Sequence, residues 1–133
     1  MNSNEAEEMY LETILRLKKK QTFVRSADVV EAMNKARSTV SYAVNKLTKS
    51  GYIVVDGRGG IDLTAKGLEA AEAVYERHRV IKSALEAMGV EAASAEENAC
   101  RIEHIISDDV FEQIKNILKS KSKTNFSLDK TSE

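Results

Sequence analysis

The chain has 133 residues, of which 42% are hydrophobic and 31% charged, and its formal net charge is −1. That balance is typical of a soluble globular domain and excludes a chain that is basic throughout. No apolar run approaches the roughly 20 residues of a membrane-spanning helix, and the polar N-terminus is unlike a signal peptide. The single cysteine cannot form an intrachain disulfide, which suits a reducing compartment. We therefore expect a cytoplasmic protein with no membrane partner.

The charge is distributed unevenly along the chain. Residues 35–49 carry four basic residues and no acidic residue, whereas residues 64–133 carry ten basic and 13 acidic residues. A basic segment on an acidic body indicates one directed surface for an anionic partner, although a solvated helix face would give the same pattern.

Three helices are predicted in the first 50 residues. The first covers residues 5–20, where apolar residues recur at helical spacing and three lysines suit the negative end of the helix dipole. The second covers Ser26–Met33 with Ser26 as its N-cap, and Asn34 ends it. The third runs over Ser38–Lys49, with Ser38 as its N-cap and Gly51 after its end. Two short helices across a tight turn predict a helix-turn-helix, because the second presents hydroxyls, a tyrosine and lysines outward.

A β-hairpin is predicted directly after these helices. Its strands are Tyr52–Val55 and Ile61–Leu63, and the glycine-rich stretch Asp56–Gly60 forms the turn between them. A hairpin in this place is the wing of a winged helix, and Arg58 at its tip is placed to meet a phosphate.

The remaining sequence predicts three further helices, over residues 64–88, 95–106 and 108–118. Thr64 caps the first, Ser94 opens the second with a capping box, and Ser107 precedes the third.

The predicted fold class is therefore mainly α. A winged helix-turn-helix domain with a two-stranded wing covers residues 1–63, and a helical domain covers residues 64–120. Residues 121–133 form a polar tail that we expect to be disordered. Because so small a helical domain exposes apolar surface, we expect a homodimer to bury it.

One short stretch, "ACRIEH", carries the residues with metal-binding chemistry. Cys100, Glu103 and His104 lie at i, i+3 and i+4, which places them on one face of a helix. A thiolate, a carboxylate and an imidazole together suit a first-row transition metal. The alternative is a small buried cysteine beside a solvated glutamate and histidine.

Longer segments resemble the diphtheria-toxin-repressor and manganese-transport-regulator family of iron- and manganese-dependent repressors. The resemblance covers residues 6–118. It is carried by "EEMYLETILRL", "RSTVSYAVNKLTKSGYIVV", "LTAKG", "ERHRVIKSALEAMGV" and "ENACRIEHIISDDV". It implies a metal-responsive transcriptional repressor, with the helical domain binding metal and forming the dimer. The iron branch of this family usually carries an extra SH3-like domain, so we expect this chain to be a short form.

The resemblance implies a primary metal site formed by Met9, Cys100, Glu103 and His104. A thioether and a thiolate favour Fe²⁺ as the cofactor, with Mn²⁺ as the alternative because the short length resembles the manganese branch.

The resemblance also implies a second metal site, at which Glu12 and His78 share Glu103. The alternative is a solvated Glu12 and a hydrogen-bonded His78. Lys82 and Glu96 stand where the iron branch has ligands of its ancillary site, and the lysine argues against that site.

The implied partner is double-stranded DNA with a palindromic operator, and no small-molecule substrate is expected. Metal would act as co-repressor, by fixing the geometry in which two winged helices meet two half-sites. The expected DNA contacts are Lys35, Ala36, Arg37, Ser38, Thr39, Ser41, Tyr42, Lys46 and Arg58.

Two other classes of function are weighed against this one. A metal-independent winged-helix regulator would leave Cys100 packed or redox-responsive. An enzyme would need a general base and a substrate cleft beside the cluster, and the sequence offers neither.

Overall fold

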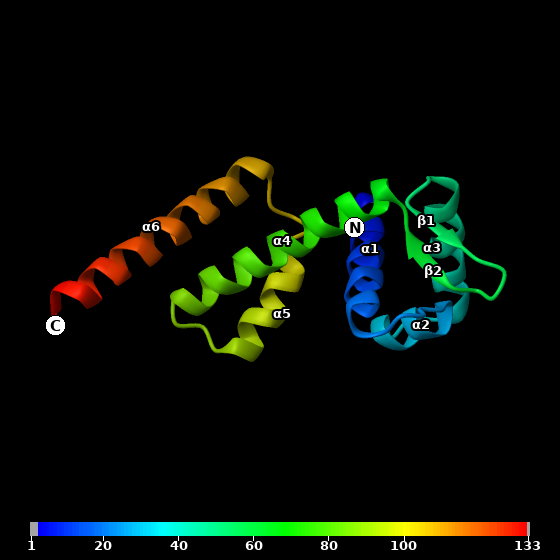
Figure 1. The fold of residues 1–133 in the computed structure, drawn as a ribbon, viewed down its shortest axis with the longest axis horizontal. Helices are drawn as coiled ribbons and strands as arrows, with labels where there is room; N and C mark the ends of the chain where they lie inside the picture. The colour runs from blue at the N-terminus through cyan, green and yellow to red at the C-terminus, as the bar shows by residue number, and fades with distance from the viewer. Residues whose placement is uncertain (1–2, 133) are drawn as a thin grey trace. The chain divides into compact units, whose positions relative to one another are not determined.

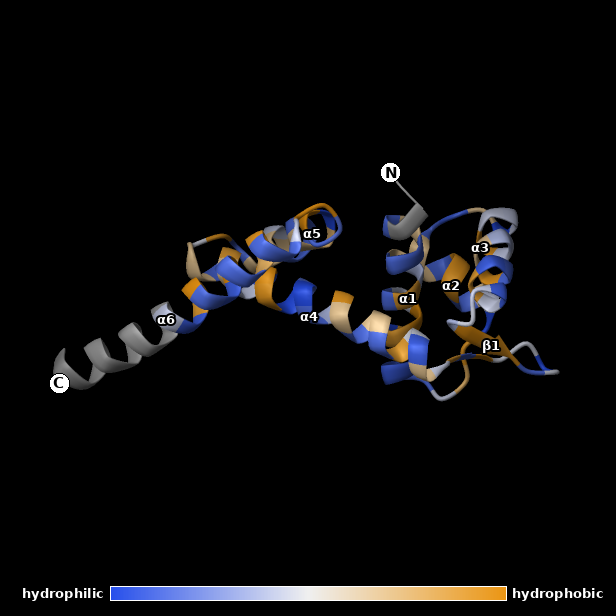
Figure 2. Cartoon of the chain, turned by 90° about the horizontal axis from the view of Figure 1, so that it is seen from above, coloured by the Kyte–Doolittle hydropathy of each residue, from blue (hydrophilic) through white to orange (hydrophobic). Residues whose placement is uncertain are grey.

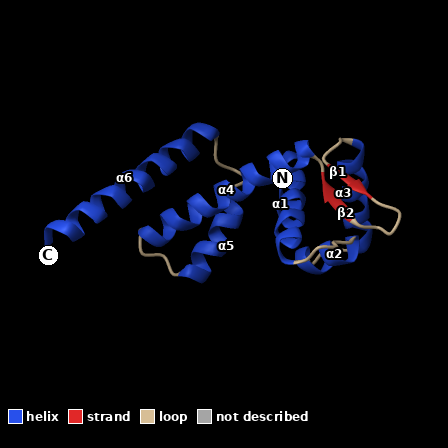
Figure 3. Cartoon of the chain, viewed as in Figure 1, coloured by secondary structure: helices blue, strands red, loops and turns tan. Residues whose placement is uncertain are grey.

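The computed structural model describes residues 3–132, which form helices and one two-stranded sheet (Figures 1 and 3). The elements are α1 (Ser3–Lys20), α2 (Ser26–Met33), α3 (Arg37–Lys49), β1 (Ile53–Val55), β2 (Ile61–Leu63), α4 (Ala65–Ala87), α5 (Ala92–Ile102) and α6 (Asp108–Ser132). The predicted mainly α fold, with a helix-turn-helix followed by a hairpin wing, is confirmed. Among the described helices, none has both the length and the apolar character needed to cross a membrane.

The chain divides into two compact units, Met1–Tyr75 and Glu76–Glu133, and the division falls within α4. The sequence places a domain boundary earlier, between residues 63 and 64. The unit boundary lies later because Ala71, in the second turn of α4, is fully buried in the first core. Tyr75 also packs against that core.

The first unit has a core built from α1, α2, α3, the start of α4 and the hairpin. Side chains with no measurable exposure come from all four of these helices and from the segment before α2. They are Ile14, Val24, Val29, Val40 and Ala71. Figure 2 shows β1 as hydrophobic along its length. Burying each valine or larger aliphatic side chain stabilises the fold by about 1.5–3 kcal/mol.

The N-termini of α2 and α3 differ from the predictions. Arg25, and not Ser26, is the N-cap of α2, and its backbone N–H donates to the Asp28 carboxylate at 2.8 Å. Ala36 is the N-cap of α3, so Ser38 already lies inside the helix. Serine is predicted at both caps because its side chain can accept a backbone N–H. Each helix instead begins after a residue in extended backbone, Arg25 for α2 and Ala36 for α3.

The C-termini of the same two helices follow the predictions. Asn34 ends α2 in the left-handed region, with φ of 53°. Gly51 follows α3 with φ of 82°, a conformation that glycine adopts without steric cost. The N–H of Tyr52 then bonds to the carbonyl of Leu47 at 3.0 Å, which closes the last turn.

The hairpin wing has the predicted strands, except that β1 begins one residue later. Its strands are antiparallel, with Ile53 opposite Leu63. The Asp56 carboxylate accepts the backbone N–H groups of Gly60 and Arg58, both at 2.8 Å, and these bonds lower the pKa of Asp56. The turn that carries Arg58 is therefore fixed by its own aspartate.

The start of α4 is hydrogen-bonded to the loop that follows α3. The Thr64 hydroxyl oxygen accepts the N–H of Gly67 at 3.1 Å, which confirms Thr64 as a cap. The same hydroxyl donates to the carbonyl of Gly51 at 2.6 Å. Gly67 approaches so closely that a Cβ there would lie 1.8 Å from the carbonyl oxygen of Tyr52.

The last two helices have different limits from those predicted. Glu91 is the N-cap of α5, and the N–H of Ala95 bonds to its carbonyl at 2.8 Å, so Ser94 lies inside the helix. Helix α6 continues to Ser132, past residue 118, in a segment without proline or glycine. Disorder of the tail 121–133 stays a prediction, and residue 133 lies outside the described residues.

The second unit has a smaller core, formed by Ile81 of α4, Ala99 of α5 and Phe111 of α6. Arg77 of α4 donates to the carbonyl of Ile106 at 3.1 Å and pairs with Asp108. The turn between α5 and α6 is therefore fastened to α4.

We predict that Gly67→Ala destabilises the first unit by about 2 kcal/mol or more, because its Cβ meets backbone that cannot move away. Helix propensity alone would give the opposite sign, since alanine is favoured over glycine by about 1 kcal/mol. Urea unfolding followed by circular dichroism measures the difference. Gly57→Ala is the control, because no atom lies within 4 Å of its added Cβ. A Gly67→Ala variant as stable as the native chain would contradict the close approach.

Candidate metal centre and nucleic-acid interface

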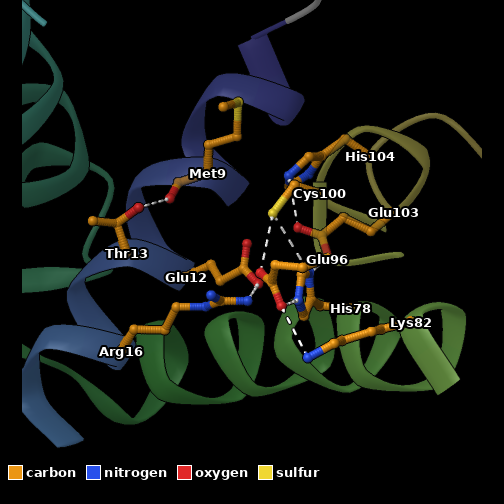
Figure 4. A network of polar contacts seen from close by, with 10 residues as sticks. All are labelled: Met9, Glu12, Thr13, Arg16, His78, Lys82, Glu96, Cys100, Glu103 and His104. Atoms are coloured by element: carbon orange, nitrogen blue, oxygen red, sulfur yellow. Dashed lines mark hydrogen bonds and ion pairs between the residues drawn. The ribbon is translucent and has the colours of Figure 1, made fainter. Parts of the chain in front are cut away.

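Five side chains with metal-binding atoms come together in the second unit (Figure 4). They are His78 of α4, Glu96 and Cys100 of α5, and Glu103 and His104 at and after the end of α5. Glu96 and Cys100 are four residues apart, so they lie one helical turn from each other on the same face of α5.

The turn after α5 changes the predicted geometry of the cluster. Helix α5 ends at Ile102, and Glu103 is its C-cap. The N–H of Ile105 bonds to the carbonyl of Ile102 at 3.0 Å, which tightens the chain into a turn. The N–H of Glu103 still bonds to the carbonyl of Ala99 at 3.0 Å, so Glu103 follows Cys100 by one helical turn, whereas His104 lies in the turn after the helix. His104 Nε2 lies 3.1 Å from Glu103 Oε1.

His78 joins α4 to both ends of this cluster. Its Nδ1 atom lies 3.0 Å from Glu103 Oε2 and 3.7 Å from the sulfur of Cys100. Its Nε2 atom lies 3.0 Å from Glu96 Oε1. The ring is 2% exposed, so these contacts are made away from bulk water. The two ring nitrogens thus face two different sets of partners.

Glu103 is the most deeply buried charged residue among the described residues. It is 1% exposed, and its two carboxylate oxygens face His78 and His104. An ionised carboxylate without a partner is costly to bury, and a positive charge beside it offsets that cost. A proton on an imidazole or a metal ion can supply that charge.

The pKa of His78 is raised from 6.5 to about 10. The largest cause is the hydrogen bond with Cys100, followed by the hydrogen bond with Glu103, and the bond with Glu96 acts in the same direction. Burial opposes the shift, because it disfavours the charged ring. Without a metal ion, His78 is therefore an imidazolium held among acceptors.

The donor atoms of this cluster suit a divalent transition metal ion. One ligand atom each from His78, Glu96 and Cys100 lie within 4.8 Å of one another. Imidazole nitrogen and thiolate sulfur select transition metals over Mg²⁺ or Ca²⁺, which prefer oxygen ligands. Cys100 is exposed, so an ion can reach its sulfur.

Glu96 is a member of the cluster that the sequence did not predict as a site residue. Its Oε1 atom contacts His78 Nε2 and lies 3.4 Å from Lys82 Nζ, while its Oε2 atom accepts from the Cys100 thiol at 3.7 Å. The available signal was its position one helical turn before Cys100. By the family resemblance it also stands where the iron branch has a ligand of its ancillary site.

Met9 and Glu12 lie on α1, in the first unit, three residues apart. The Glu12 carboxylate pairs with Arg16 at 3.1 Å, and the carbonyl of Met9 accepts the Thr13 hydroxyl at 2.8 Å (Figure 4). The other predicted ligands lie in the second unit, which brings together four of the six: His78, Cys100, Glu103 and His104.

The residues predicted to contact DNA lie on α3, on the link before it and on the wing. Most of them are exposed. The exposed ones are Ala36, Arg37, Ser38, Thr39, Ser41, Tyr42 and Arg58. Tyr42 is 71% exposed and so contributes little to the core, which leaves its ring available to a partner.

The two half-buried lysines of this surface have contacts with α1. Lys46 Nζ lies 3.5 Å from the Glu7 carboxylate, and Lys35 Nζ lies 5.6 Å from the centre of the Tyr10 ring. These four side chains also line a groove between α1 and α3. The basic face of α3 is therefore positioned partly by the first helix.

Two sequence models of one family match the chain. "Iron dependent repressor, N-terminal DNA binding domain" matches residues 3–61. "Iron dependent repressor, metal binding and dimerisation domain" matches residues 64–125. Together these matches cover both units.

Curated relatives are similar over most of the chain. The diphtheria toxin repressor of Corynebacterium diphtheriae is 31% identical over 120 residues, which are 90% of this chain and 53% of that protein. The regulator MntR of Shouchella clausii is 32% identical over 112 residues, which are 84% and 78%. An uncharacterised helix-turn-helix regulator of Methanocaldococcus jannaschii is 34% identical over 110 residues, which are 81% and 88%. The chain thus spans about half the length of the diphtheria toxin repressor.

Solved structures of similar proteins share the fold. A manganese-dependent transcriptional repressor in complex with manganese has a TM-score of 0.79 and 27% identity, over 85% of this chain and 52% of that one. The manganese regulator SloR has a TM-score of 0.74 and 29% identity, over 85% and 53%.

We predict that the stability of the metal-free protein falls as the pH rises above neutrality. Because the folded-state pKa of His78 is above its unfolded value, the charged ring stabilises the fold. This contribution is complete below about pH 6.5 and is lost as the pH rises toward about 10, by at most about 1.4 kcal/mol per pH unit.

Urea unfolding with a chelator present, at several values of pH, measures this dependence. His78→Gln should flatten it, and an NMR titration should find the His78 ring still protonated at pH 8. A native chain with a flat stability profile from pH 6.5 to 10 would contradict the charged state of His78.

Proposed function

This chain belongs to the iron-dependent repressor family of metal-dependent, DNA-binding transcriptional repressors, and we propose that it controls genes of metal homeostasis with Fe²⁺ as its co-repressor. Members of this family are transcriptional repressors and not enzymes. The proposed location is the cytoplasm, where the single cysteine stays reduced.

One observation carries the proposal. The second unit gathers two imidazoles, a thiol and a buried carboxylate, and the first unit presents an exposed recognition helix. The first feature suits a regulatory ion, and the second suits a DNA groove. An ion bound at the first feature would control DNA binding by the second.

The proposed primary site consists of Met9, Cys100, Glu103 and His104. The bound ion supplies positive charge and coordination bonds, which compensate the buried Glu103 carboxylate. With Met9 from the first unit and three ligands from the second, occupancy would link the two units. Ligand binding that favours one arrangement shifts the population toward it.

The choice of Fe²⁺ over Mn²⁺ rests on two sulfur atoms. The thioether of Met9 and the thiolate of Cys100 are soft donors, whereas Mn²⁺ is better served by carboxylates and water. Mn²⁺ remains the alternative, supported by relatives and structures whose names refer to manganese. Glu12 and His78 are the proposed ligands of a second ion if two are bound.

The proposed DNA interface is the exposed face of α3 with the link before it and the wing. Lys35, Arg37, Lys46 and Arg58 would neutralise phosphates, and the hydroxyls of Ser38, Thr39 and Ser41 with the Ala36 methyl and the Tyr42 ring would face base edges. Because the residues proposed to face base edges include no arginine or asparagine, which make bidentate contacts with bases, we expect DNA shape to contribute to specificity.

A homodimer on a palindromic operator completes the proposal. The second unit exposes large apolar side chains, among them Met88 at 74% and Ile117 at 66% exposed. These two line a groove between α4 and α6 together with Ala84 and Leu118. Pairing two copies would remove such surface from water and provide two recognition helices.

We predict that Fe²⁺ raises operator affinity by about 5–150-fold, the usual range of allosteric coupling, and that Cys100→Ala abolishes the increase. The probe is a duplex selected from a random pool in the presence of the ion, in an anaerobic gel-shift assay. Arg101→Ala is the control, because this neighbouring side chain is exposed and pairs with Glu97 of the same helix.

Affinity that does not respond to Fe²⁺ or Mn²⁺ would overturn the metal switch. If affinity responded to oxidation of Cys100 instead, the redox-responsive regulator would take its place.

We also predict that Met9→Asp shifts ion preference toward Mn²⁺, because a hard oxygen replaces a soft sulfur. Isothermal titration with each ion measures the ratio of the two affinities. Gln21→Asp is the control, since it adds a carboxylate at an exposed position of the first unit that belongs to neither proposed metal site. An unchanged ratio in Met9→Asp would remove Met9 from the proposed ligands.

A further inference from the structure

We propose that Lys82 and Glu96 determine which nitrogen of His78 binds the ion, and that Glu96 acts as a positioning residue and not as a ligand. Glu96 accepts the Nε2 hydrogen of His78, and Lys82 holds Glu96 in place. His78 then presents Nδ1 to an ion shared with Cys100 and Glu103. This inference rests on the proposed function, because it concerns His78, a proposed ligand of the second ion, beside two ligands of the primary site.

The contacts of Glu96 support a positioning role. Its Oε1 atom lies 3.0 Å from His78 Nε2 and 3.4 Å from Lys82 Nζ. Its Oε2 atom accepts from the Cys100 thiol at 3.7 Å. Both oxygens therefore already serve hydrogen-bond donors, and one of them also faces a fixed ammonium charge. An ion bound to Oε1 would have to lie beside that charge.

The opposite side of the imidazole has the features of a binding position. His78 Nδ1 lies 3.0 Å from Glu103 Oε2 and 3.7 Å from the Cys100 sulfur. The nitrogen comes from α4, the sulfur from α5 and the oxygen from the residue that ends α5. Glu103 is buried, so a cation here compensates a carboxylate that has little access to water.

A histidine ligand commonly donates its other ring N–H to a carboxylate, which fixes the tautomer and the ring orientation. Glu96 is placed to do this, because the bond to Nε2 leaves Nδ1 as the nitrogen with a lone pair once its proton is lost. The proton balance is simple: Nδ1 and the Cys100 thiol each release a proton to solvent, and the ion replaces both.

Lys82 follows His78 by four residues on α4, so the two side chains lie one helical turn apart and converge on Glu96. The Lys82–Glu96 pair is partly exposed, with side-chain exposures of 34% and 40%, so it adds little to stability. Its effect is to restrict the position of the Glu96 carboxylate.

NMR of the full chain loaded with ¹¹³Cd²⁺ tests the assignment directly, without any variant. We expect coupling from cadmium to His78 Nδ1 and a proton retained on Nε2. Coupling to Nε2, or no coupling to His78 although the ion is bound, would overturn the inference and leave the proposed function intact. A chain that binds no Cd²⁺ would overturn both.

Variants test the roles of the two positioning residues. Glu96→Ala should weaken Cd²⁺ binding by about 10–100-fold, and Glu96→Gln should recover part of the loss because its carboxamide oxygen still accepts the Nε2 hydrogen. Lys82→Met should weaken binding by about tenfold. Affinity is measured by competition with a chromophoric chelator, after circular dichroism has established that each variant is folded.

Glu97→Gln and Lys119→Gln are the matched controls, because both side chains are exposed and lie on α5 and α6 away from His78. We expect both controls to bind Cd²⁺ as the native chain does. Native affinity in Glu96→Ala would overturn the positioning role of Glu96, and native affinity in Lys82→Met would overturn that of Lys82.

Discussion

The carboxylate of Glu103 is buried between two imidazole rings, and the chemistry of the second unit follows from this arrangement. A carboxylate without access to water has to be matched by positive charge. Protonated His78 can supply it when no ion is present, and a divalent cation can supply it when the site is filled. If the ion binds the Nδ1 atom of His78, as proposed, ion binding and proton release are linked. The site would then hold positive charge in either state.

Backbone signals in the sequence predicted where helices end better than where they begin. Asn34 and Gly51 were recognised because left-handed backbone is sterically costly for most residues, and few residue types can occupy it. Ser38 and Ser94 are predicted as caps because the serine side chain can accept a backbone N–H. In the structure Ala36 and Glu91 take those places through extended backbone alone, which any residue can adopt. Because every residue type can adopt this conformation, no residue type in the sequence predicts it.

The candidate site could be predicted only where its residues are close in the sequence or carried by the family resemblance. The spacing of Cys100, Glu103 and His104 predicts a group of donors, and α5 ends at Ile102, so His104 lies in the turn that follows. Glu96 and Lys82 belong to different helices, and they meet because α4 and α5 pack around the small core of the second unit. Such a meeting depends on tertiary packing, which the sequence of either helix alone does not reveal.

Arg77 adjoins His78 on α4, donates to the carbonyl of Ile106 and pairs with the side chain of Asp108. These contacts hold the segment that carries His104 in place without an ion. Little conformational entropy then remains to be lost on coordination by the donors of this unit. Preorganisation of this kind strengthens binding without adding a ligand. A substitution at Arg77 would thus weaken ion binding by loosening the segment that carries His104, although Arg77 is not a proposed ligand.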